Sequence, residues 1–156
     1  MKSFVLTCSL FLMTTLSCGA QTDVYYNIKK FLALNHPEVT TDNRLIAFNV
    51  WSSSDMESRE ENKSFEKACS VYEYAKLKGG SKGIVVVAVS KDNLSSTAVI
   101  SFTKDGIHKL ISCKMADIEG IDAVAKNMVF DSQGKEVYKN LPSSEIFNSI
   151  HQLITR

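Results

Sequence analysis

The chain has 156 residues, of which 44% are hydrophobic, and its 18 Lys and Arg residues nearly balance its 17 Asp and Glu residues. This length and composition suffice for one globular domain with a sizeable core. The near-zero net charge excludes the basic footprint that nucleic-acid-binding domains carry, so we expect no nucleic-acid partner.

The first twenty residues are typical of a secretory signal peptide. Lys2 provides the short positive start, and residues 4–16 form a mostly apolar run. Such a run is too short to span a bilayer but has the length of a signal's hydrophobic region. We therefore predict an exported chain with a signal peptide at 1–20, an N-terminal helix and linker at 21–43, and one domain at 44–156.

Two modes of signal cleavage remain open. The segment Leu16-Ser17-Cys18-Gly19 resembles the lipobox of bacterial lipoproteins, in which Cys18 is lipidated and becomes the mature N-terminus, although Thr15 stands where lipoboxes usually carry Leu. Alternatively, ordinary signal peptidase cuts after Ala20. The first mode tethers the domain to a membrane of the bacterial envelope through acyl chains, and the second releases it into the periplasm.

A helix and a strand begin the domain. Apolar side chains from Val24 to Leu32 recur at helical spacing, which predicts an amphipathic helix over residues 23–34, ended near Pro37. A polar linker follows, and residues 44–51 are predicted to form a buried strand.

A long helix is predicted over residues 55–78. Ser54 and Glu57 have the spacing of a capping box at its start, and Gly79-Gly80 is expected to end it. Residues 83–90 are an apolar, β-branched run without polar alternation, which is typical of a central strand covered on both faces. With the preceding strand, this segment predicts a right-handed βαβ unit.

The second half of the chain is predicted to add a helix at 94–104, a short strand at 107–113, an irregular stretch or one short helix at 117–124, a β-hairpin at 126–139 with its turn at 131–134, and a last helix opening at Pro142. A parallel βαβ half followed by a hairpin and a covering helix predicts an α/β three-layer sandwich on a mixed sheet.

Three separated blocks resemble the exported TlpA/ResA-type thiol-disulfide reductases, which have the thioredoxin fold. Those proteins carry the pattern N-F-W-A-x-W-C-x-P-C-R-x-E after their first core strand, and Asn49, Trp51, Arg59 and Glu61 match it. The resemblance covers about residues 40–156 and implies a thioredoxin-like sandwich. The other two blocks are Ala88-Val89-Ser90-Lys91-Asp92 at a strand end and Phe130-Asp131-x-x-Gly134-Lys135 in the hairpin.

The positions that carry this family's chemistry differ here. Asp55 stands where the attacking cysteine would be, Ser58 where the resolving cysteine would be, and Ala125 where the family has a cis-proline. Disulfide exchange requires a thiolate, and a non-proline cis bond costs about 3 kcal/mol. The resemblance therefore implies the fold without its redox reaction, with no catalytic residue at these positions and a trans bond at Ala125.

Asp55 and Ser58 also admit a hydrolytic or metal-binding interpretation, but their place at a helix start is explained by capping. Glu57, Glu60 and Glu61 form the acidic, solvated start that is ordinary for a helix. The three histidines lie in a loop, a strand and a helix without metal-ligand or triad spacing, and there is no Gly-rich phosphate loop. We expect neither a cofactor nor a metal.

The domain retains two cysteines. Cys69 lies on the apolar face of its helix and is predicted to be a small buried hydrophobe, whereas Cys113 lies at a strand end. A Cys69–Cys113 disulfide would persist in an exported compartment. The alternative is two free thiols.

These features predict a redox-inactive domain that binds an unidentified protein or peptide of the envelope. The expected contact surface is the rim formed by Trp51, Ser54, Asp55 and Ala125, since the corresponding groove receives peptides in the family that the chain resembles. One alternative is a non-standard thiol oxidoreductase using Cys69 or Cys113. Another is a structural role in an envelope assembly, anchored through Cys18.

Overall fold

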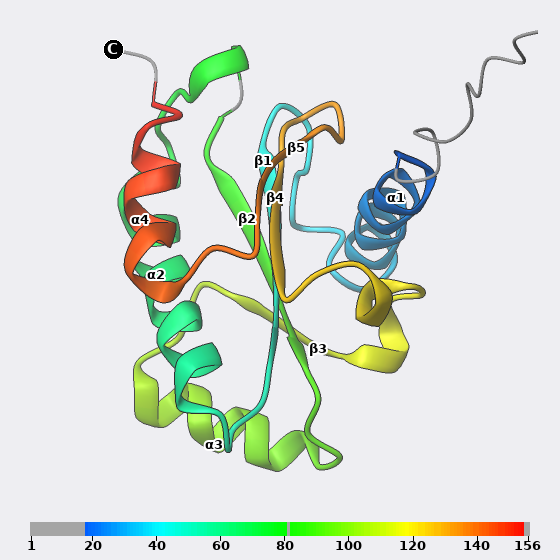
Figure 1. Ribbon diagram of the computed structural model, residues 1–156, viewed down its shortest axis with the longest axis vertical. Helices are drawn as coiled ribbons and strands as arrows, with labels where there is room; N and C mark the ends of the chain where they lie inside the picture. Colours follow the sequence, from blue (N-terminus) through cyan, green and yellow to red (C-terminus); the bar gives the residue numbers. More distant parts are fainter. Residues whose placement is uncertain (1–17, 81, 155–156) are drawn as a thin grey trace, which may run out of the picture.

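A computed structural model describes residues 18–80 and 82–154 (Figure 1). Most of the predicted signal peptide lies outside the described residues. The first helix, α1, spans Cys18–Asn35, so the predicted N-terminal helix is confirmed and begins at Cys18 rather than at residue 23. Within the described residues, no helix combines the length and the apolar character needed to cross a membrane.

Five strands form one mixed sheet in the order β3-β2-β1-β4-β5. β1 pairs in parallel with β2, and β2 with β3, whereas β4 runs antiparallel to both β1 and β5. The predicted βαβ unit and the predicted β-hairpin are therefore confirmed. The strands are β1 (Leu45–Trp51), β2 (Ile84–Ser90), β3 (Ile111–Lys114), β4 (Asn127–Phe130) and β5 (Glu136–Lys139).

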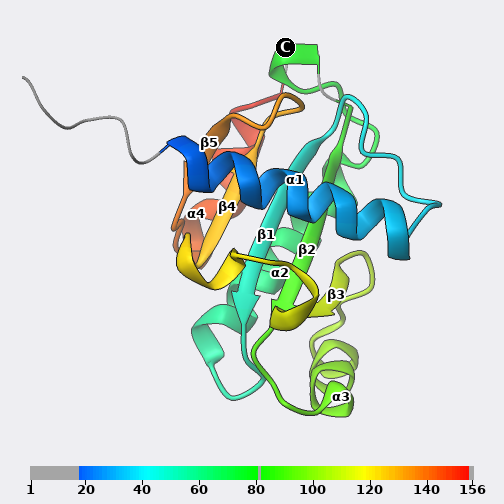
Figure 2. The same cartoon turned by 90° about the vertical axis from the view of Figure 1, so that its right-hand side faces the viewer.

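Helices cover both faces of this sheet, which makes the predicted three-layer sandwich (Figures 1 and 2). Side chains of β1 alternate between the layers: Leu45 and Ala47 pack toward α2 and α4, whereas Ile46 and Phe48 pack toward α1. Because both faces are buried, the strand reads as an unbroken apolar run. The remaining helices are α2 (Met56–Tyr72), α3 (Ser95–Asp105), α4 (Ser143–His151) and the short 3-10 helices η1 (Lys78–Gly80), η2 (Met115–Asp117) and η3 (Ile121–Ala123).

The prediction for the end of α2 was wrong. The helix ends at Tyr72 rather than at residue 78, and Gly79-Gly80 belongs to η1. Leu77 is buried in the core and forms an isolated bridge with Ile154, so it leaves the helix to pack beside α4. Burial of this leucine outweighs the few tenths of a kcal/mol that continued helix would offer.

The start of β3 was also predicted too early. The α3 helix ends as expected, with Gly106 in the left-handed region at φ 71°. The N–H of Ile107 then donates to the carbonyl of Phe102 at 2.9 Å, which ties residue 107 to the helix end instead of to the sheet. β3 consequently begins at Ile111.

The hairpin turn docks onto α1. The hydroxyl of Tyr25 donates to the carbonyl of Ser132 at 3.0 Å. Gly134, at φ 83°, lies so close to the Tyr25 ring that an added Cβ would sit 2.6 Å from a ring carbon. The N-terminal helix is therefore packed into the domain and is not a separate appendage.

Candidate functional site

The predicted site lies where β1 ends and α2 begins, at the lower end of the sheet in Figure 1. Asp55 is the N-cap of α2, with extended backbone, and its Oδ1 accepts from the N–H of Glu57 at 3.1 Å. Hydrogen bonding from Ser58, and then from that N–H, holds the pKa of Asp55 below its usual value. The capping interpretation of Asp55 is confirmed, whereas Ser54, expected to cap, lies one residue before the cap.

Ser58 points into the protein. It is only 1% exposed, and its hydroxyl donates to the carbonyl of Asp55 at 3.1 Å while accepting from the N–H of Ser52 at 3.3 Å. Both of these partners are backbone groups of the same turn, and the hydroxyl also lies close enough to the Asp55 carboxyl to lower its pKa. The burial of Ser58 and its two backbone contacts are explained by closing the start of α2, as the capping interpretation expects.

Asp92 fixes the turn that precedes α2. Its carboxylate accepts from the hydroxyl of Ser52 at 2.8 Å and from the N–H of Ser53 at 3.2 and 3.1 Å. The sequence placed Asp92 in a block that resembles reductases but did not show this role. The aspartate joins the end of β2 to the end of β1, and thereby holds residues 52–54 in place.

A polar cluster lies buried beneath α2. Asn49, fully buried, donates through Nδ2 to the carbonyl of Ser58 at 3.1 Å and to Oδ1 of Asn62 at 2.9 Å. Asn49, which matches the reductase pattern, therefore lies under the first turns of this helix, and Glu61, another match, is a buried residue of the helix itself. The match at these positions reflects a buried polar layer that secures the helix start.

Glu61 was expected to be solvated and is instead only 1% exposed. Lys126 lies 2.8 Å from its Oε1 through Nζ and 3.3 Å from Oε2 of the exposed Glu57. Burial raises the pKa of Glu61, and Lys126 opposes that rise without cancelling it. Lys126 follows Ala125, so this ion pair ties the segment before β4 to α2. Sequence spacing gave no signal for it.

Trp51 and Ala125 do not form the expected exposed surface. Trp51 is 1% exposed and stacks on Phe102 with ring centroids 4.8 Å apart. Ala125 is half-buried and packs on the α1 side of the sheet, and no cis peptide bond occurs in the described residues. Of the four predicted rim residues, Ser54 and Asp55 are exposed. These two residues are therefore the exposed part of the rim.

Cys69 and Cys113 are both free, and each is buried. Cys69 belongs to the core on the α2 side of the sheet and Cys113 to the core on the α1 side. The sheet separates them, so the suggested Cys69–Cys113 disulfide is wrong. Burial raises the pKa of each thiol to about 12, which leaves both protonated at neutral pH. Cys18 is the first residue of α1.

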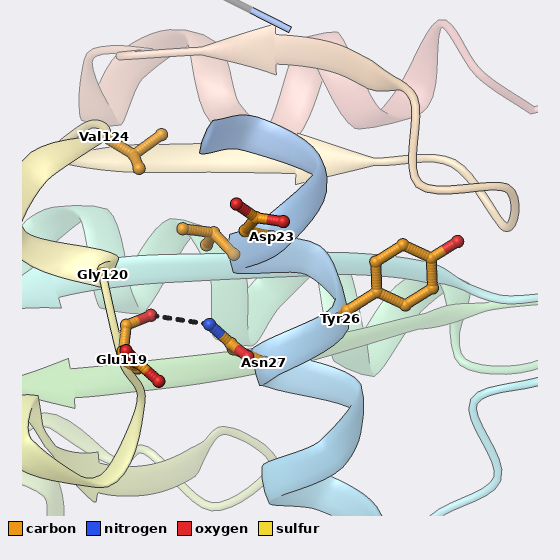
Figure 3. A pocket seen from close by; sticks show the side chains of 7 residues that line it. Asp23, Tyr26, Asn27, Glu119, Gly120 and Val124 are labelled. Carbon is orange, nitrogen blue, oxygen red and sulfur yellow. Dashed lines mark hydrogen bonds between the residues drawn. The ribbon is translucent and has the colours of Figure 1, made fainter. Parts of the chain in front are cut away.

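Two surface hollows have neither Ser54 nor Asp55 in their walls. One, of about 440 Å³, includes Asp92 and Cys113 in its wall at the ends of β2 and β3. The other, of about 430 Å³, lies between α1 and the segment before β4, where Nδ2 of Asn27 donates to the carbonyl of Glu119 at 3.1 Å (Figure 3). In the described parts of the chain, no three His, Cys, Asp or Glu residues gather in an arrangement that could hold a metal.

No protein-family model and no curated protein matches this chain. Solved structures do match it. The thioredoxin domain of a thiol-disulfide oxidoreductase from Bacteroides vulgatus aligns with 16% identity and a TM-score of 0.59, over 74% of this chain and 82% of that one. A thiol-disulfide oxidoreductase from Bacteroides fragilis aligns with 16% identity and a TM-score of 0.55, over 72% and 83%.

A secreted disulfide oxidoreductase from Mycobacterium tuberculosis aligns with 9% identity and a TM-score of 0.53, over 72% of this chain and 84% of that one. Likeness at such low identity establishes a shared fold but not a shared activity, because one fold hosts many chemistries. The activity has to be argued from the residues at the site.

Proposed function

We propose that this chain, a thioredoxin-like domain by its fold, is an exported protein that has lost disulfide exchange and acts by binding a protein or peptide at its rim. The observation that carries the proposal is the state of Asp55 and Ser58. These residues occupy the two positions that hold cysteines in the reductases that the sequence resembles, and both are used to cap and close the start of α2.

The remaining thiols do not replace the missing pair. A disulfide-exchange site needs a thiolate that a second thiol can reach, and these two are protonated and lie on opposite faces of the sheet. Titration of the native protein with a thiol reagent should therefore detect no rapidly reacting group. One accessible thiol of low pKa, at Cys69 or Cys113, would instead support a non-standard oxidoreductase.

Reduction of insulin by dithiothreitol tests the loss of chemistry. We expect the wild-type protein to give no turnover above the uncatalysed rate, because a carboxylate cannot form a mixed disulfide. The variant Asp55→Cys/Ser58→Cys restores two sulfurs at the start of the same helix and serves as the matched positive control. Turnover by the wild type would refute the proposal.

Capture from the exported fraction tests the binding half. Ser54→Arg places a large charged side chain on the exposed rim, and Ser70→Arg makes the same change on the exposed side of α2. We expect a protein that the wild type retains to be lost with Ser54→Arg and kept with Ser70→Arg. Equal retention by both variants would exclude the rim as the contact surface.

Export and its mode are separate parts of the proposal. The apolar leader supports export, and Cys18 is the residue to which a lipid would attach. Mass spectrometry of the mature N-terminus distinguishes the two modes: acylated Cys18 indicates an anchored protein that could also serve in an envelope assembly, and unmodified Gln21 indicates a periplasmic one. An N-terminus at Met1 would contradict export.

A further inference from the structure

A short basic hairpin closes the end of the molecule opposite the rim. We use this name for residues 76–80 and 82, in which Lys76 and Lys82 form an antiparallel bridge. Leu77 is buried and bridges Ile154, so the segment is fixed to the core between two exposed lysines, Lys76 and Lys78. Lys82 is exposed as well. The hairpin therefore presents three lysines from a packed base.

The charges of these lysines are uncompensated. Among residues 18–80 and 82–154, no carboxylate lies within ion-pair distance of Lys76, Lys78 or Lys82. Of the carboxylates near this end, Glu73 pairs with Lys109 and Asp131 accepts N–H groups of its own turn, while the exposed Asp42 makes no ion pair with these three lysines. The basic hairpin is thus free to meet an external anion.

The fold places this hairpin and the start of α1 on the same half of the molecule. In Figures 1 and 2, η1 lies at the upper end and the first turn of α1 lies in the upper half, whereas α2 begins at the lower end. Cys18 is the first residue of α1, and Val24 is already buried against the sheet. Little chain separates any lipid on Cys18 from the folded domain.

We propose that the basic hairpin docks the domain on the anionic phospholipid headgroups of a membrane, with the rim turned away from the lipid. The inference rests on the proposed export, which brings the domain to a membrane surface and away from nucleic acid. Each lysine near an anionic surface contributes about 1 kcal/mol, which is about a fivefold change in partitioning. Three lysines supplement a lipid anchor, since a single acyl chain holds a protein only marginally.

Vesicle co-sedimentation tests this proposal. The full chain carrying Cys18→Ser cannot be acylated there, and it is mixed with neutral phosphatidylcholine vesicles or with vesicles containing about 30% phosphatidylglycerol. The comparison with neutral vesicles accounts for the apolar leader, which every sample carries. We expect tighter binding to the anionic than to the neutral vesicles, with the excess falling by about tenfold or more in Lys76→Gln/Lys78→Gln/Lys82→Gln and weakening as salt screens the charges.

The matched control makes the same charge change at the other end. Lys91→Gln/Lys104→Gln/Lys114→Gln removes three exposed lysines near the C-terminal ends of the strands and on α3, and should change binding by less than about twofold. Equal losses in the two triple variants, equal binding to neutral vesicles, or no binding would overturn the proposal. So would tighter binding to single-stranded DNA than to the anionic vesicles. None of these results bears on peptide capture at the rim.

Discussion

At the lower end of the sheet, Asp55, Glu61 and Asp92 each have a partner within the protein, whereas at the upper end Lys76 and Lys78 have no carboxylate partner among the described residues. The acidic groups below are parts of the structure, since they cap a helix, fix a turn and hold a segment against α2. The lysines above contribute nothing comparable to the fold. Charge that is satisfied internally serves stability, and charge left unpaired is available to a partner.

The largest expected effect on this contrast comes from removing one cation at each end of the sheet. We expect Lys126→Met to lower the free energy of unfolding by about 2–3 kcal/mol at neutral pH, because the Glu61 carboxylate stays buried without a counter-charge and the lysine itself is partly exposed. Lys82→Met should change it by less than about 0.5 kcal/mol. Urea denaturation followed by circular dichroism measures both. Similar losses at the two ends would remove the distinction.

The next effect concerns the turn before α2. Asp92→Ala leaves the hydroxyl of Ser52 and the N–H of Ser53 without their acceptor, and should cost about 1–2 kcal/mol of unfolding free energy. Asp42→Ala, an exposed carboxylate at the other end, is the control and should cost less than about 0.5 kcal/mol. Thermal melts rank the two. A neutral Asp92→Ala would mean that the turn holds its shape unaided.

A smaller effect separates the true helix cap from the expected one. Asp55→Ala removes the side chain that accepts from the N–H of Glu57 and should destabilise the protein by about 1 kcal/mol. Ser54→Ala, one residue earlier, should change stability by no more than a few tenths of a kcal/mol. If the urea midpoints showed the reverse order, Ser54 would be the cap, as its capping-box spacing suggested.

The smallest expected effect is a change in how the free energy of unfolding varies with pH. Burial raises the pKa of Glu61 above its ordinary value of 4.5, so the folded protein binds this proton more tightly than the unfolded chain does. The carboxyl therefore contributes stability that is fully present below pH 4.5 and is lost as the pH rises through the folded pKa. The difference in unfolding free energy, wild type minus Glu61→Gln, should decrease with rising pH across that window.

The matched control for this slope is Glu60→Gln. Glu60 lies on the same helix but is half exposed and pairs with Lys63 in solvent. A profile that Glu61→Gln left unchanged would show that the buried carboxyl does not titrate differently on folding.

Periodicity explains why most elements were predictable from sequence. The apolar run of β2 and the helical spacing of apolar residues in α1 each encode burial directly, and Gly106 and Gly134 occur where the backbone enters the left-handed region. The end of α2 was not predictable, because a distant contact between Leu77 and Ile154 decides it. Local propensity is too weak to oppose such burial.

The candidate site was likewise predictable only in part. That Asp55 and Ser58 bring no sulfur to the start of α2 is visible in the sequence, and so is the capping role of Asp55. The burial of Trp51 was not, since an aromatic residue at a strand end can face either solvent or core. In the folded protein, Trp51 stacks on Phe102 of α3, so the exposed part of the rim is smaller and more polar than predicted.

The sequence by itself determined the order of helices and strands, the mixed sheet and the absence of sulfur at the start of α2, because these follow from residue type and local spacing. Only the tertiary structure decided that Cys69 and Cys113 lie on opposite faces of the sheet and that Lys126 reaches Glu61. Both facts depend on how segments distant in the chain are placed side by side, which no local pattern specifies.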